Sequence, residues 1–254
     1  MNDTLTRSLS PAPSRPVVRS SRASLPKLVG LEMRKSLSTR SGKALALASV
    51  GLGPVSLAIA SLSAPPLGSA AGPLGVMGML TAFVLLSFGV LSTAGEWSHR
   101  TVQTTFLLVP QRGRVLTAKA ASVALLGAAF AAMSTALSAG VLAVTMSGLS
   151  WGGTPRALVT AVAAGAAFSV IGAGVGAALG NTPAALTGLY LVILGGMPVL
   201  ETFKPAVATK IDPAAAVIDL AQGHAQTTSV LILTGWVVVS LAAGVVMTRR
   251  RPVS

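Results

Sequence analysis

The feature that most constrains this chain is a series of six apolar runs, each long enough to cross a lipid bilayer. A spanning helix needs about 20 residues, because the hydrocarbon core is about 30 Å thick. Backbone groups find no water to bond inside lipid, so such runs are expected to be helical. We expect spans at 44–64, 74–94, 119–146, 157–179, 184–200 and 229–248. The predicted fold is all-α, a polytopic membrane protein with six transmembrane helices.

The composition agrees with this prediction. Of the 254 residues, 52% are hydrophobic and 10% are charged, whereas a soluble domain carries about 25% charged residues. No run has a charged residue in its core, although Lys119 stands at the start of the third. The lack of ionisable residues at mid-membrane weighs against an ion-coupled carrier. The absence of Cys excludes disulfides and thiolate chemistry.

Two segments precede the first run. Residues 1–24 are rich in Ser, Pro and Arg and cannot bury enough apolar surface to fold, so they are expected to be a disordered basic tail. Residues 25–42 are expected to form an interfacial helix. Its apolar stripe would hold Val29, Met33 and Leu37, which recur every fourth position among basic residues. A solvated charged leader is the alternative.

Proline pairs mark two further helix starts. The Thr-Pro pair at 182–183 predicts an N-cap and first turn for the fifth span, and the Asp-Pro pair at 212–213 predicts a short helix over 213–222. Glycine and proline near the end of the fifth run predict a kink or unwound turn there, at Gly195, Gly196 and Pro198.

The placement of basic residues predicts the orientation. Sixteen of the 19 Lys and Arg residues lie before the first span, in the connection 95–119, or in the tail 249–254. Short basic segments favour the cytosolic side, so both termini are expected to be cytosolic. The Ala- and Arg-rich, Lys-poor composition is associated with a bacterial source, so the expected location is a bacterial cytoplasmic membrane. The net charge of +13 is then explained by topology and contact with anionic lipid. It is not explained by nucleic-acid binding, which needs a basic folded face with stacking aromatics.

The sequence predicts no enzyme and no cofactor. Catalysis needs polar groups within mutual reach, and the spans supply none. His99 and His224 are expected on opposite sides of the membrane, so no metal site is predicted. The pair Gly42-Lys43 lacks both the preceding Gly and the following Ser or Thr of a phosphate-binding loop.

Glycines repeat every fourth residue at the end of the fourth run, at Gly172, Gly176 and Gly180. Glycine at this spacing lets helix backbones approach closely in lipid. Packing within the bundle is the simpler interpretation, and a seam between two copies is the alternative.

The connection 95–118 is the most mixed segment of the chain. One face of a short helix would be apolar, made by Trp97, Val102, Phe106 and Val109. Pro110 would end that helix, and a basic turn at 112–114 would follow. The residues alone leave two interpretations open, a docking element for a partner protein and a loop on the membrane surface.

This segment resembles the corresponding stretch of the permease subunits of ABC type-2 transporters, which include antibiotic and bacteriocin-resistance exporters. The matching positions are Glu96, Arg100-Thr101, Thr104-Thr105, Leu107-Leu108, Pro110, Arg112 and Lys119. The stretch Leu31–Lys35 is similar to the amphipathic helix before the first span of that family. The stretch Gly176–Ala185 is similar to its hairpin between the fourth and fifth spans, with Asn181 where a basic residue is common.

The resemblance implies a half-transporter for a hydrophobic or amphipathic substrate, with no ATPase of its own. Its partners would be a second permease, membrane lipid and a cytosolic P-loop ATPase. The implied coupling residues are Glu96, Arg100, Thr101, Phe106, Pro110, Arg112 and Arg114. Glu96 is expected to cap the loop helix or to pair with a basic residue, and the loop 201–228 to shape an exit path. The main alternative is a membrane anchor or assembly subunit of another complex.

Overall fold

The computed structural model describes residues 24–63, 68–98 and 112–251. Within these ranges six helical segments are long and apolar enough to cross a membrane. They are α2 (Arg40–Ser61), α3 (Ala71–Ser98), α5 (Arg112–Thr145), α6 (Thr154–Leu179), the continuous stretch Thr182–Phe203, and α11 (Gln226–Arg250). The all-α, polytopic fold predicted from the sequence is thereby confirmed, and the chain is a multi-pass membrane protein.

The helices extend beyond the apolar runs. Helix α3 continues to Ser98 and α5 already begins at Arg112, so residues 112–114 lie in the first turn of α5. The expected basic turn at this position is therefore wrong. An apolar run stops at the first charged residue, whereas a helix continues as long as its backbone hydrogen bonds are made.

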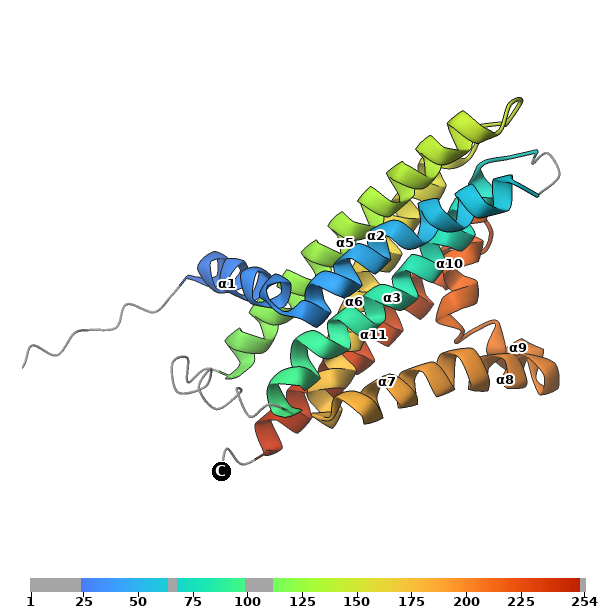
Figure 1. Cartoon of the computed structure of the whole chain (residues 1–254). Coiled ribbons are helices and arrows are strands. Elements are labelled where there is room, and N and C mark those ends of the chain that lie inside the picture. The colour runs from blue at the N-terminus through green and yellow to red at the C-terminus, as the bar shows by residue number, and fades with distance from the viewer. Residues whose placement is uncertain (1–23, 64–67, 99–111, 252–254) are drawn as a thin grey trace, which may run out of the picture.

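The N-terminal segment divides into two helices at Thr39. Helix α1 (Leu25–Ser38) ends at this residue, whose extended backbone has φ −80° and ψ 149°. The Thr39 hydroxyl then accepts a hydrogen bond of 3.0 Å from the amide of Gly42 and caps α2. One residue thus stops α1 and starts α2, and α1 lies across one end of the bundle (Figure 1).

The fifth segment contains a π-helical section. It consists of α7 (Thr182–Tyr190), the π-helix η1 (Leu191–Gly196) and α8 (Met197–Phe203). The irregularity falls where Gly195 and Gly196 predict one. The N-cap is Asn181 and not Thr182, because the Asn181 side chain accepts a 2.9 Å hydrogen bond from the amide of Ala184. Figure 1 shows α7 leaving the bundle at an angle.

The chain returns to the bundle through two short helices, α9 (Pro205–Ala208) and α10 (Pro213–Gln222). The second has the bounds predicted from the Asp-Pro pair. Asp212 caps it by accepting hydrogen bonds from the amides of Ala214 and Ala215, at 2.7 and 3.3 Å. The connection between α8 and α11 is therefore largely helical.

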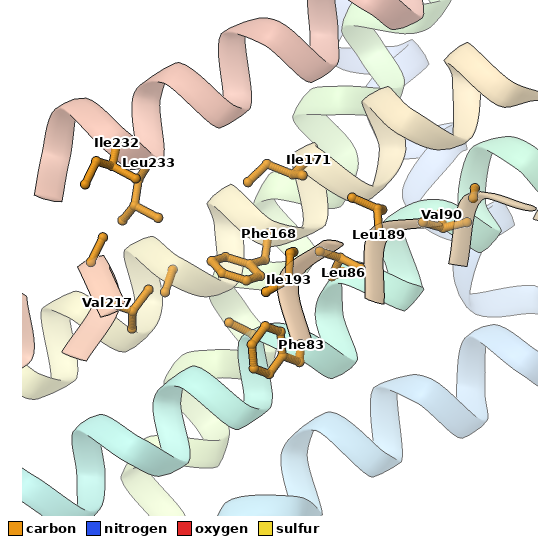
Figure 2. Close-up of a cluster of buried hydrophobic side chains, with 14 of the residues drawn as sticks. Phe83, Leu86, Val90, Phe168, Ile171, Leu189, Ile193, Val217, Ile232 and Leu233 are labelled. Atoms are coloured by element: carbon orange, nitrogen blue, oxygen red, sulfur yellow. The ribbon is translucent and has the colours of Figure 1, made fainter. Parts of the chain in front are cut away.

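The centre of the bundle is the contact between α3 and α6. Phe83 of α3 and Phe168 of α6 pack edge to face with ring centroids 5.6 Å apart. Figure 2 shows these rings within a larger apolar cluster to which α7, η1, α10 and α11 also contribute. Residues from six elements thus share one core.

The end of the bundle opposite α1 is closed by two loops that pair with each other. The amide of Ala70 donates to the carbonyl of Ser150 at 3.0 Å, and the amide of Ser150 donates to the carbonyl of Gly68 at 3.2 Å. This is an isolated bridge, and the described residues form no strand.

Candidate functional site

Helix α1 turns a charged residue, not only an apolar stripe, toward the bundle. Its buried residues are Leu28 and Glu32, one turn apart, whereas Leu31 is 52% exposed. Met33 and Leu37 are partly buried against an apolar cluster. The expected stripe therefore lies at the edge of the contact, and Glu32 lies at its centre.

Glu32 belongs to a group of four charged side chains that joins three helices. We call Glu32 and Lys35 of α1, Glu96 of α3 and Lys119 of α5 the charged cluster. The Lys119 ammonium donates to Glu32, to Glu96 Oε1 at 2.8 Å and to the carbonyl oxygen of Ser92 at 3.0 Å. Lys35 makes a second ion pair with Glu96. Side chains from three separate parts of the sequence therefore meet at Glu96 and Lys119.

The contacts of Lys119 contribute more to the charged cluster than the contact of Lys35, because Lys119 is buried. The Lys119 side chain is 5% exposed, whereas that of Lys35 is 42% exposed. Removing a charge from water costs several kcal/mol, which is offset only by good pairing and hydrogen bonds. The ammonium group has three N–H donors, and all three have an acceptor here. The cluster is therefore a fixed joint between α1, α3 and α5.

The cluster lies inside the helices and not in a loop. Lys119 stands about two turns into α5, and Glu96 is in the last turn of α3. The sequence places both residues at the edges of spans and predicts no pairing between the third span and the N-terminal helix. Lys119 is 87 residues from Glu32 and 23 residues from Glu96 along the chain, so no local sequence pattern could reveal these ion pairs. The only signal was the presence of isolated charges at the ends of apolar runs.

The predicted coupling residues fall partly within the described structure. Glu96 is in the charged cluster, and Arg114 lies in the first turn of α5. The backbone of Arg112 begins that helix. Arg100, Thr101, Phe106 and Pro110 lie outside the described residues, as does the predicted short helix. The segment 99–111 is thus bounded by Glu96 on one side and by the start of α5 on the other.

A second polar contact ties the end of the chain to the same end of the bundle. The Arg251 guanidinium donates to the carbonyls of Ala178 and Leu179 at 2.6 and 2.8 Å, the last carbonyls of α6. Its central carbon lies 5.1 Å from the centroid of the Trp97 ring. A cation at a helix C-terminus is stabilised by the exposed carbonyls. Arg251 therefore connects α11, α6 and α3.

The three repeated glycines have two different roles in the structure. A Cβ at Gly172 would overlap the carbonyl oxygen of Leu86, and one at Gly176 would stand 2.6 Å from Thr93 Oγ1. These two glycines therefore let α6 approach α3. Gly180 instead ends α6 in the left-handed region, with φ +61°, beside the Arg251 guanidinium.

The rest of the described chain offers little chemistry. No three His, Cys, Asp or Glu side chains within 24–63, 68–98 and 112–251 gather into a metal site. No family model matches the chain, and no curated protein matches its sequence. The charged cluster and its position beside segment 99–111 are therefore the main structural evidence on function.

Proposed function

We propose that this chain is the permease subunit of an ATP-driven exporter of the ABC type-2 class, working with a separate P-loop ATPase and a second permease. Six spanning helices and the resemblance of residues 96–119 to such permeases support the proposal. The charged cluster is the observation that supports the exporter proposal most strongly. Glu96 and Lys119 flank the segment that would meet the ATPase, and they bind each other and α1.

The cluster supplies a mechanical path for coupling. A displacement of segment 99–111 by a closing ATPase would act on the end of α3 and the start of α5 together, because the Glu96–Lys119 pair joins them. It would also act on α1, through the pairs that Glu32 and Lys35 make. Three helices would then move as a unit. Such a joint movement is required if a contact at one docking segment is to tilt several spanning helices. In this proposal both termini and segment 99–111 face the cytosol of a bacterial cell.

The test is a change in the docking segment. Phe106→Asp places a charge in the apolar face that is proposed to enter a groove on the ATPase. Aromatic anchors in such grooves carry much of the binding free energy. Affinity purification of the tagged wild-type chain in mild detergent is expected to recover a P-loop ATPase in roughly equal amount. Phe106→Asp is expected to recover less by about tenfold or more.

The matched control is Trp151→Asp, which changes an aromatic residue that is 41% exposed at the opposite end of the bundle. It is expected to recover the ATPase like the wild type. Recovery of no ATPase with folded wild-type protein would contradict the exporter proposal and favour the anchor or assembly role. Equal recovery with Phe106→Asp would contradict the assigned docking face.

A further inference from the structure

A cavity of about 680 Å³ opens beside the charged cluster, between α1, α2, α3 and the start of α7. Lys35 and Ser36 of α1 and Ser41 of α2 line one part of it. Phe88, Leu91 and Gly95 of α3 line another. The volume is in the range of sites that enclose a small molecule.

The lining changes from polar to apolar along α3. Glu96 and Lys35 lie near the end of the bundle, whereas Phe88 lies about two turns of α3 deeper, or roughly 12 Å along the helix axis. The deep end is apolar because Phe88 and Leu91 line it. A ligand that fills the cavity therefore needs a polar head and an apolar body.

The polar end favours an anionic head. Lys35 is half-exposed and uses its ammonium group on Glu96, but an ammonium group has three N–H donors. The hydroxyls of Ser36 and Ser41 add further donors. Both carboxylates of the cluster are paired with Lys119, and residues 25–43 hold five Lys and Arg against one acidic residue. The charged residues that line the cavity are Lys35, Glu96 and Lys119, two cations against one carboxylate, so the charged lining is positive by one.

We propose that this cavity binds one molecule of a phosphate-bearing amphiphile, with the phosphate at Lys35, Ser36 and Ser41 and the hydrocarbon against Phe88 and Leu91. In the orientation proposed above, the polar end faces the cytosolic leaflet, where anionic lipids are found. That assignment to a leaflet rests on the proposed function, whereas the site itself rests on the cavity.

Gly95 lines the cavity and offers a position at which its volume can be reduced. A Cβ at Gly95 has no neighbouring group within 4 Å, so Gly95→Leu projects into open space. Gly140 of α5 also has no neighbouring group within 4 Å and does not line the cavity, so Gly140→Leu is the matched control. Gly95→Ala is a smaller change at the same position and tests whether the effect follows side-chain volume.

The binding measurement uses lysophosphatidylglycerol and the full chain, purified in neutral detergent, with bound amphiphile counted by native mass spectrometry. Wild type and Gly140→Leu are expected to bind one molecule saturably. Gly95→Leu is expected to bind at least about tenfold more weakly than the wild type. The affinity of Gly95→Ala is expected to lie between those of Gly95→Leu and the wild type. Unchanged elution and melting temperature establish that Gly95→Leu is folded.

Two further arms identify the head group and its source. Lys35→Gln is expected to reduce the preference for lysophosphatidylglycerol over lysophosphatidylcholine, whereas Lys27→Gln, on the same helix and outside the cavity, leaves it unchanged. Inorganic phosphate alone is expected not to compete, because it lacks the hydrocarbon that Phe88 and Leu91 would contact. Competition by phosphate would instead identify a free-anion site and overturn the amphiphile proposal.

Wild-type affinity in a folded Gly95→Leu variant would also overturn it. No ATPase is present in this measurement. A failure of binding therefore leaves the exporter proposal intact, and a failure to recover the ATPase leaves the binding site intact.

Discussion

The cost of burying the Lys119 ammonium group is offset by its three hydrogen-bond acceptors. Its side chain is buried among two carboxylates and a backbone carbonyl, and each of these groups would itself be costly to bury alone. Lys35 adds a second pair to Glu96, but its side chain is 42% exposed, and exposed pairs contribute little, about 0–1 kcal/mol. At the scale of single residues, the joint between α1, α3 and α5 therefore depends mainly on Lys119.

Lys119→Met is expected to destabilise the folded state by about 3–5 kcal/mol, because it leaves Glu32 and Glu96 buried with less compensation. The measurement is denaturant unfolding of the purified chain, followed by tryptophan fluorescence. Adding Glu32→Gln and Glu96→Gln to Lys119→Met is expected to recover much of the loss, since no buried charge then lacks its partner. Lys27→Met, on the exposed side of α1, serves as the control, and equal losses in both lysine variants would contradict the assigned role.

The structural elements are placed by close contacts that the sequence shows only as small residues. Gly172 and Gly176 lie against the backbone of α3, where any side chain would meet the Leu86 carbonyl or the Thr93 side chain. Without a hydrophobic driving force between helices in lipid, such close approach is a main source of helix association. The contact between α3 and α6 is therefore sensitive to side-chain volume at these two positions.

Gly172→Leu is expected to destabilise the protein by at least about 1–3 kcal/mol, because the side chain would force α6 away from α3. Gly140→Leu, at an open position on α5, is expected to have little effect. Thermal unfolding in detergent compares the two variants. A stable Gly172→Leu monomer that has lost self-association would instead place the glycine seam between two copies.

The capping residue of α7 gives a test at the level of one hydrogen bond. Asn181→Ala removes the acceptor of the Ala184 amide and is expected to cost about 1 kcal/mol. Thr182→Ala leaves that bond in place and is expected to cost less. Denaturant midpoints of the two variants provide the comparison, and a larger loss for Thr182→Ala would return the cap to the residue that the Thr-Pro pattern favours.

At the scale of the whole molecule, the sequence predicts the positions of the helices along the chain better than the contacts between them. Apolar length is enough to find the six spanning segments, and Asp212 is enough to find α10, because both signals are local. The break at Thr39, the burial of Glu32 and the contact of Arg251 with α6 depend on neighbours distant in sequence. The candidate site follows the same rule: Glu96 and Lys119 stand out as isolated charges, but their pairing is a property of the fold.

The orientation of the whole chain can be measured directly because it contains no Cys. Ser24→Cys, at the start of α1, and Ser147→Cys, in the turn after α5, place single thiols at opposite ends of the bundle at exposed positions. A maleimide that cannot cross membranes is expected to label position 147 in intact cells, and position 24 only after permeabilisation. The reverse pattern would invert the proposed topology.

The charged cluster also has a consequence for how the protein is made. A chain is synthesised from its N-terminus onward, so Glu32 and Glu96 are made before Lys119, which binds them both. Until α5 has been made, the two carboxylates wait at the membrane boundary, where water can still hydrate them. The Glu32–Lys119 pair, which holds α1 against α5, can form only after the third spanning helix has been made. The complete set of contacts of α1 with the bundle therefore exists only once three of the six spanning segments have been made.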